Sequence, residues 1–178
     1  TEAGHIGRLL SSYALAYPEL RLRLQHNDRQ MLRTDGTGSL PDVVLALFGL
    51  DVAQEMLPID APPSAPGGIV VSGLVGAPAV HRSNRNDIVL FVNRRWIQDQ
   101  TLSFAIREAY RTLLPQGRFP IVILNMGIDP EQVDVNIHPT KREVRFRDPR
   151  LVFAAVQRAV RATLLAQHTV PVVAVPGM

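Results

Sequence analysis

The sequence of 178 residues contains no cysteine, which excludes disulfides, thiolate zinc sites and cysteine nucleophiles. It also lacks the positively charged opening and apolar core of a secretory signal. The uncharged stretch near Gly67 to Val80 contains Gly and Pro and falls short of the ~20 apolar residues that span a bilayer. We therefore expect a soluble, cytoplasmic protein with no membrane partner.

Lysine and aromatic residues are scarce. Of the nineteen basic residues, all are Arg except one Lys, Lys141. A genome rich in G and C explains the bias towards Arg. The surviving Lys hints at a site where a flexible ammonium fits and a planar guanidinium does not. The aromatic content of 6% argues against a protein that binds single-stranded nucleic acid by base stacking.

The remaining composition is typical of one compact domain. Hydrophobic residues make up 46% of the chain and charged residues 20%, which is too apolar for a disordered protein. Residues 1–80 hold five Arg against eight acidic residues, a net charge of −3, whereas residues 81–178 hold fourteen basic residues against eight acidic ones, a net charge of +6. The second part is therefore the candidate for contact with a polyanion.

Periodicity predicts a mixed α/β domain over 1–167, followed from 168 by the start of a flexible linker. Apolar spacing and capping residues predict helices over 3–16, 40–48, 101–114 and 151–166. Alternating and β-branched runs predict strands near 20–25, 30–33, 69–75, 88–92, 96–97, 120–126, 133–138 and 144–146. The Pro-rich and Gly-rich stretch over 58–68 predicts a loop.

The segment Val133 to Phe146, VDVNIHPTKREVRF, carries the most specific pattern. It predicts a half-buried strand that leads into a loop stiffened by Pro139, with Lys141 near the loop tip. Such a tip can present a point charge to a phosphate held by another surface, or it can simply carry a solvated lysine. Asp134 and His138 share a strand face, but no nucleophile, second carboxylate or metal set accompanies them as a general base pair. We expect His138 to order the loop.

This segment closely resembles the end of the second domain of MutL-family DNA mismatch-repair proteins, where a DVNVHP strand precedes a loop lysine and EVRF. Three further segments agree in order: TEAGHI at the start, FVNRRWI at 91–97 and the acid-proline-glutamine stretch Asp129 to Val133. One departure is Arg94, where family members often carry Gly. The resemblance implies an α/β sandwich like domain two of ribosomal protein S five, with a left-handed βαβ crossover.

The function implied by this resemblance is that of a transducer domain, which is not itself an enzyme. In the family, a lysine in the position of Lys141 contacts the γ-phosphate of ATP, which is bound with Mg in a preceding domain of the same chain. Lys141 and Thr140 are then the nucleotide-contacting residues, supported by His138 and Pro139, and Lys141 assists catalysis only in trans to the absent ATPase domain. The family's magnesium-binding Asn, catalytic Glu and glycine-rich lid cannot be placed here, so we expect the fragment alone to bind no cofactor and no metal.

The resemblance also implies contact with DNA and other partners. Family transducer domains help to line a positively charged cleft that holds double- and single-stranded DNA. Arg94, Arg95, Arg107 and Arg111 are the named candidates, within a wider basic set that adds Arg82 and Arg85. We expect Trp96 to pack in the hairpin or the core. The implied protein partners are the upstream ATPase domain, the mismatch-recognition protein MutS and a second copy of the full-length chain.

Two other interpretations remain open from the sequence. A transducer domain of a related type II topoisomerase uses a similar lysine, but it does not predict the spelling NIHPTKREVRF. A free-standing basic nucleic-acid-binding module would use Lys141 as just another phosphate contact.

Overall fold

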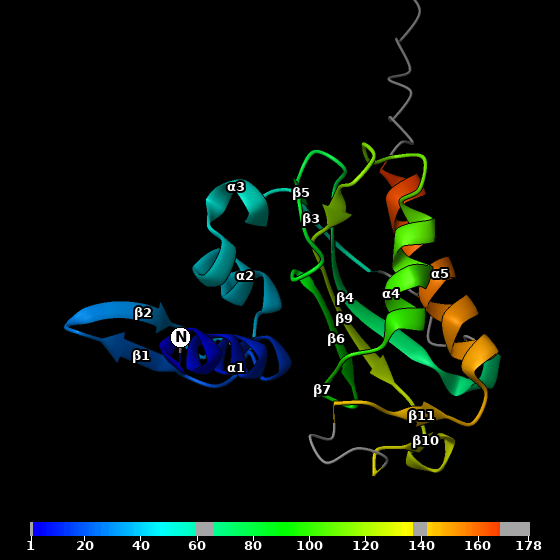
Figure 1. Cartoon of the computed structure of the whole chain (residues 1–178), viewed down its shortest axis with the longest axis horizontal. Helices are drawn as coiled ribbons and strands as arrows, with labels where there is room; N and C mark the ends of the chain where they lie inside the picture. The colour runs from blue at the N-terminus through cyan, green and yellow to red at the C-terminus, as the bar shows by residue number, and fades with distance from the viewer. Residues whose placement is uncertain (1, 60–65, 137–141, 168–178) are drawn as a thin grey trace, which may run out of the picture.

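The computed structural model describes residues 2–59, 66–136 and 142–167. Its centre is a five-stranded mixed sheet (Figure 1). In order across the sheet, the strands are β3 (Met56–Pro58), β4 (Val70–Gly76), β9 (Val122–Gly127), β6 (Ile88–Val92) and β7 (Arg95–Ile97). Neighbouring strands pair antiparallel except β6 and β9, which run parallel.

Two helices, α4 (Gln100–Ala109) and α5 (Pro149–Ala166), lie side by side over one face of the sheet (Figure 1). Each begins at an aspartate whose carboxylate accepts a backbone N–H three residues on, Asp99 from Leu102 at 2.8 Å and Asp148 from Leu151 at 3.1 Å. Because parallel strands need a crossover connection, α4 lies between β6 and β9 in the chain and packs back onto the sheet.

The opposite face of the sheet is covered by the first part of the chain. This part contains α1 (Glu2–Ala16), a hairpin of β1 (Arg23–His26) and β2 (Arg29–Arg33), α2 (Leu40–Phe48) and α3 (Leu50–Ala53). The remaining elements are short: η1 (Pro66–Gly68), β5 (His81–Arg82) paired with β8 (Phe119–Pro120), η2 (Pro130–Gln132), and β10 (Val133–Asp134) paired with β11 (Arg145–Phe146).

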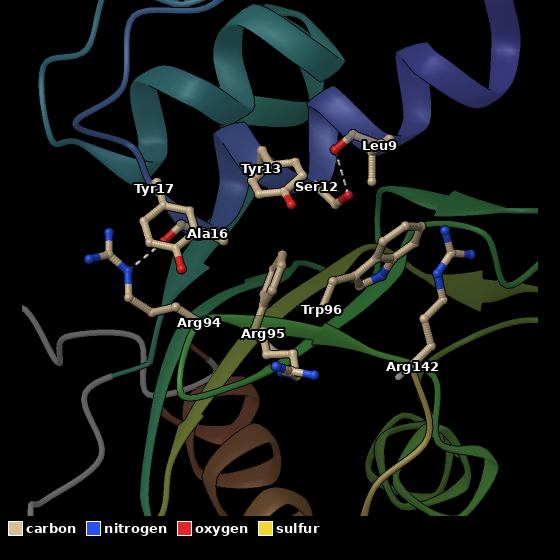
Figure 2. Close-up of a pocket in the computed structure, with 10 residues that line it drawn as sticks. Leu9, Ser12, Tyr13, Ala16, Tyr17, Arg94, Arg95, Trp96 and Arg142 are labelled. Atoms are coloured by element: carbon tan, nitrogen blue, oxygen red, sulfur yellow. Dashed lines mark hydrogen bonds between the residues drawn. The ribbon is translucent and has the colours of Figure 1, made fainter. Parts of the chain in front are cut away.

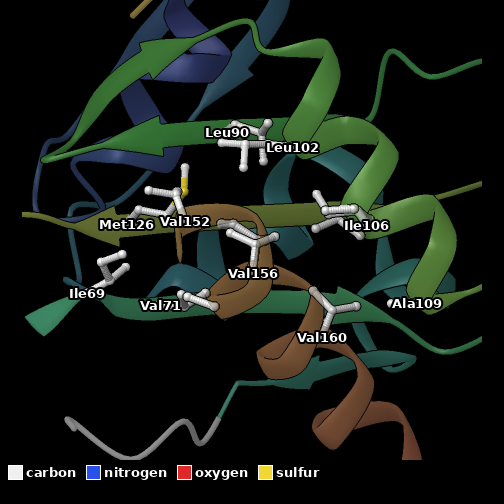
Figure 3. Packing of buried hydrophobic residues seen from close by; sticks show 14 of the residues in the cluster. Ile69, Val71, Leu90, Leu102, Ile106, Ala109, Met126, Val152, Val156 and Val160 are labelled. Carbon is white, nitrogen blue, oxygen red and sulfur yellow. The ribbon is translucent and has the colours of Figure 1, made fainter. Parts of the chain in front are cut away.

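The sheet is buried on both faces, because alternate side chains of its central strands point in opposite directions. Leu90 and Val92 join the hydrophobic cluster under α4 and α5, together with Met126 and Val156 (Figure 3). Phe91, between them in β6, joins the second cluster, which α1, α2 and α3 complete. Strands buried on both sides account for the continuous apolar run over 88–92.

The predicted α/β fold is confirmed, and most predicted elements are present. The parallel pairing of β6 and β9 confirms a βαβ crossover, whose hand stays a prediction. The first strand of the N-terminal hairpin begins at Arg23 rather than near 20, because the Thr34 hydroxyl bonds the carbonyl of Leu20 and the N–H of Leu22. The sequence did not predict α3, β3 or the β5–β8 pair.

Two predicted elements are shorter than expected. The helix predicted over 101–114 ends at Ala109, so Arg111 lies in the turn that follows and not on the helix. There the backbone N–H groups of Tyr110 and Arg111 bond the carbonyls three residues back, which tightens the chain out of the α-helical pattern. The strand predicted over 133–138 ends at Asp134 within the described residues. Across the described ranges, no helix is long and apolar enough to cross a membrane.

Candidate functional site

The loop between β10 and β11 contains the residues predicted to contact nucleotide. The strands pair antiparallel, with Val133 opposite Phe146 and Asp134 opposite Arg145, so the two ends of the loop are held together. The four predicted loop residues lie outside the described ranges: His138, Pro139, Thr140 and Lys141. What the structure describes is the frame that carries them.

The entry to this loop is shaped by an aspartate turn. The Asp134 carboxylate accepts the backbone N–H of Asn136 at 2.9 Å, which ends the strand. Just upstream, the Asp129 carboxylate accepts the N–H of Glu131 at 2.9 Å and opens η2. The acidic residues of this stretch therefore serve backbone turns, and Asp134 already has a hydrogen bond independent of His138.

The exit from the loop is held by Arg142. Its guanidinium lies 4.3 Å from the centroid of the Trp96 ring, and its carbonyl accepts the backbone N–H of Gln98 at 2.8 Å. Both contacts are with the β7 end of the β6–β7 hairpin. Two residues further on, Val144 is buried in the main core, and so is Phe146. The hairpin therefore fixes the position of the residue that follows Lys141.

The tip of the same hairpin is tied to α1. Asn93 and Arg94 form its turn with φ of 48° and 67°, the left-handed conformation of a tight hairpin. The Arg94 guanidinium donates to both carboxylate oxygens of Glu19, at 2.5 and 2.6 Å, and to the carbonyl of Ala16 at 2.7 Å. It also lies 4.2 Å from the centroid of the Tyr17 ring. The hydrogen bond from Arg94 lowers the pKa of Glu19.

Between α1 and the hairpin lies a crevice of about 360 Å³ (Figure 2). Tyr13 approaches it from α1 and Tyr17 from just after this helix, while Trp96 and Arg142 stand on the opposite wall. The Arg95 guanidinium points away from α1 in this view, although Arg95 contributes to the lining. Phe91, which is 1% exposed, also lines the crevice. The crevice thus lies between the first part of the chain and the frame of the lysine loop.

A second hollow, of about 160 Å³, lies at the C-terminal end of α4. Three arginines line it, Arg107, Arg111 and Arg118. Arg107 lies 5.2 Å from the ring centroid of Phe119, and Arg111 approaches Glu108 at 3.9 Å through a largely exposed side chain. Among the described residues, neither Arg107 nor Arg118 makes an ion pair, so their charges are available to an anion.

The predicted DNA-contacting arginines are therefore divided between two places. Arg94 and Arg95 belong to the hairpin tip, and Arg94 is already paired with Glu19. Arg107 lies in the last turn of α4 and Arg111 in the turn after it, and α4 is on the opposite side of the sheet from α1. In the described part of the chain, no group of three or more His, Asp or Glu residues can hold a metal ion.

Sequence reasoning missed two arginines of these places, Arg142 and Arg118. Neither lies on a periodic face, and each was counted only in the net charge of the second part of the chain. The structural role of Arg142 depends on its contact with Trp96. This tryptophan is 46 positions earlier in the chain, and the β7 strand places it beside Arg142. The only available signal was adjacency: Arg142 immediately follows the single lysine.

The chain is similar to DNA mismatch-repair proteins. The family model for the DNA mismatch repair protein, C-terminal domain, matches residues 44–165. The DNA mismatch repair protein MutL of Symbiobacterium thermophilum is 44% identical over 171 residues, which are 96% of this chain and 26% of that protein. The MutL of Desulforudis audaxviator is 42% identical over 171 residues, 96% of this chain and 30% of that protein.

A solved structure, the N-terminal domain of a DNA repair protein, matches 90% of this chain and 53% of its own with a TM-score of 0.71. At 20% sequence identity this likeness concerns the fold alone. The chain spans 26 to 30% of the length of the two curated relatives, at a sequence identity that places it firmly with them. It belongs to the MutL family of DNA mismatch repair proteins.

Proposed function

We propose that this chain is the non-catalytic transducer domain of a MutL protein, in which Lys141 reaches the γ-phosphate of ATP bound by the preceding domain. The observation that carries the proposal is the frame of the lysine loop. Its two ends are paired as β10 and β11, and its exit is held to the β6–β7 hairpin by Arg142. A loop on a rigid frame can present one ammonium in a reproducible position.

The hairpin also supports coupling between the lysine loop and the first part of the chain. Its tip is bonded through Arg94 to Ala16 at the end of α1 and to Glu19 beyond that helix, and its other end is bonded to Arg142. A displacement of the loop by nucleotide is therefore passed to α1 through one hairpin. Lys141 and Thr140 contact the phosphate in this proposal, with His138 and Pro139 setting the loop. The negative charge that Lys141 detects is that of the γ-phosphate of ATP, which the preceding domain binds with Mg.

Contact with DNA is the second part of the proposed function. It is supported by the arginines on and beside α4 and α5, the two helices that cover one face of the sheet. α5 carries three arginines and no acidic residue, and Arg158 and Arg161 are exposed. Beside it, Arg107, Arg111 and Arg118 surround the second hollow. Arginines on one face of the molecule suit the phosphate backbone of duplex DNA, which needs no base-reading element. Arg95 is a further proposed contact to DNA, which can be double- or single-stranded. The other proposed partners of the full-length, cytoplasmic protein are MutS and a second MutL subunit.

The test of the nucleotide role is Lys141→Ala in the full-length MutL protein that carries this domain. Loss of a charge-assisted contact to phosphate should lower ATP turnover about ten- to hundredfold, with an unchanged thermal melt. Lys141→Arg should restore turnover only partly, because a guanidinium is planar and bulkier than an ammonium. Wild-type turnover in the Ala variant would sink the assignment.

The 178-residue chain by itself provides a second test. One lysine without a phosphate cradle and a magnesium site supplies too little binding energy, so calorimetric titration with ATP and Mg should show no binding. Micromolar affinity would place the nucleotide site within this chain and overturn the proposed division of labour.

A further inference from the structure

The strand that leaves the lysine loop is held by residues beyond Arg142. Val144 is 8% exposed and Phe146 is 6% exposed, and both are part of the main core. Phe146 also pairs with Val133 in the β10–β11 ladder. These contacts are sufficient to hold β11, because buried side chains and a strand ladder already fix it. The contacts of Arg142, which is only half-buried, are additional.

Arg142 is held on a π face rather than by a carboxylate. Its guanidinium lies 4.3 Å from the centroid of the Trp96 ring, within the range of a cation–π contact. No ion pair of Arg142 is found among the described residues. The second contact, from the Gln98 N–H to the Arg142 carbonyl, fixes the backbone at the same place. We call the Arg142–Trp96 contact, together with this hydrogen bond, the loop clasp.

Trp96 stands on a part of the hairpin that cannot easily move. It pairs with the buried Phe91 across the hairpin. At the tip, the Asn93 side chain both donates to the carbonyl of Ile128, at 2.8 Å, and accepts the N–H of Ile128, at 3.0 Å. The backbone N–H of Arg94 donates to the Asn125 side chain at 2.9 Å. The wall behind the loop clasp is therefore bonded to the central strand β9 and the segment after it.

From these contacts we infer that Trp96 and Arg142 are positioning residues for Lys141, an inference that rests on the proposed function of that lysine. Successive Cα atoms of a trans chain lie about 3.8 Å apart, so a residue fixed at 142 limits where a side chain at 141 can reach. Trp96 therefore acts through Arg142, and neither residue contacts the nucleotide. The role of the loop clasp is to keep the ammonium of Lys141 at the distance that the phosphate requires.

Trp96 is the only tryptophan in the chain, so its fluorescence reports the loop clasp directly. In the 178-residue chain, Arg142→Gln should change the emission and raise the quenching of Trp96 by acrylamide, because one face of the ring loses its guanidinium. Arg29→Gln, an exposed arginine on β2, is the matched control and should leave both readings unchanged. Identical quenching in the Arg142→Gln and control variants would overturn the loop clasp.

The functional test uses the full-length MutL protein with Trp96→Leu, Trp96→Phe and Arg142→Gln. Loss of this half-buried cation–π contact should lower kcat for ATP about two- to fivefold in Trp96→Leu and in Arg142→Gln, with KM little changed. Trp96→Phe keeps a π face and should recover most of the loss. Thermal melts identify any variant that fails through unfolding, and the double variant Trp96→Leu with Arg142→Gln should fall no further than either single one.

The Lys141→Ala variant separates the two ideas. If Lys141→Ala loses turnover while Trp96→Leu and Arg142→Gln keep the wild-type kcat, the positioning role is wrong and the phosphate contact stands. If Lys141→Ala itself keeps wild-type turnover, the proposed function fails first. A Trp96→Phe variant as impaired as Trp96→Leu would also contradict the inference, since the π face would then be irrelevant.

Discussion

At the scale of single residues, Gly73 is the position where the sheet depends most on a missing side chain. It lies in the middle of β4 with φ of 131°, and a Cβ there would lie 2.0 Å from the carbonyl oxygen of Ile123 on β9. Both the backbone conformation and the close approach to β9 require glycine. The central strands β4 and β9 can therefore pair only because residue 73 has no side chain.

Gly73→Ala should destabilise the chain by more than about 3 kcal/mol, because the added methyl must displace backbone and not a flexible side chain. Gly7→Ala is the matched control. Gly7 lies in α1 with open space around it, so the same change should stabilise the chain by about 0.5–1 kcal/mol through helix propensity. Urea unfolding of both variants checks the prediction, and equal effects would contradict it.

The Glu19–Arg94 pair should make stability sensitive to acid. The hydrogen bond from Arg94 holds the pKa of Glu19 below the ordinary 4.5 in the folded chain. A carboxylate with a lowered folded pKa stabilises the fold above its unfolded pKa, and this contribution is lost as the pH falls through the folded pKa.

The measurement is the difference in melting temperature between the wild type and Glu19→Gln. Both side chains are about half exposed, so the difference should be small at neutral pH and should vanish once the pH falls below the lowered pKa of Glu19. A difference that persisted unchanged in acid would show that the Glu19→Gln substitution acts through packing and not through charge.

At the scale of elements, the β6–β7 hairpin contains the residue at which this sequence departs from the family pattern, Arg94. Its turn lies between the strands predicted near 88–92 and 96–97, and both turn residues, Asn93 and Arg94, adopt positive φ. The departure noted at Arg94, where family members often carry Gly, fits a position at φ of 67° that favours glycine. The structure supplies a compensating role for the arginine, since it bonds Ala16 at the end of α1 and Glu19 three residues later.

Arg94→Gly and Arg94→Ala separate these two effects. Both variants lose the contact with α1, but Gly relieves the left-handed backbone and Ala does not, so Arg94→Gly should be more stable by about 1 kcal/mol. Chemical denaturation measures the difference. If the two variants were equally stable, the backbone conformation of residue 94 would carry no cost.

Much of the element order could be predicted, because it depends on local pattern. Ser39 and Asp148 mark helix starts in the sequence and are observed as caps at those positions, whereas the cap of α4, Asp99, was not predicted. Helix ends are set by contacts that periodicity does not contain. At the end of α4, Tyr110 is buried and its hydroxyl donates to the carbonyl of Gly76 at 2.6 Å, and this burial raises the pKa of Tyr110. The apolar pattern that includes Leu113 therefore extends beyond the last residue of the helix.

The candidate site was predicted only in part, for the same reason. Lys141 could be selected because a single lysine among arginines and a family resemblance are properties of the sequence. The assignment of Arg94, Arg95, Arg107 and Arg111 to DNA stays a prediction. All four residues contribute equally to the net charge. The fold, however, places Arg94 and Arg95 at the hairpin tip and Arg107 and Arg111 at the second hollow, and it pairs Arg94 with Glu19. A sequence cannot show which charges are already neutralised by a partner 75 residues away.

At the scale of the whole molecule, the arginines of α4 and the turn after it should bind duplex DNA weakly and without sequence preference. Arg107→Glu with Arg111→Glu should weaken binding at low salt and reduce the slope of log affinity against log salt by about two. Arg23→Glu with Arg29→Glu makes the same charge change on exposed residues of the N-terminal hairpin. Fluorescence anisotropy with a labelled duplex checks both variants, and an equal loss in the two would mean that net charge alone governs binding.

The double burial of the sheet has a consequence for how this protein can be divided. The family match covers residues 44–165 and so omits α1, whose Ala14, Leu15 and Ala16 help to bury one face. A shortened chain limited to the match would expose the ring of Phe91 and part of its apolar surroundings to water. It should therefore self-associate in solution more strongly than the longer chain, which analytical ultracentrifugation of both would measure. The α1 layer is in this sense a built-in solubility cover that the matched region 44–165 lacks.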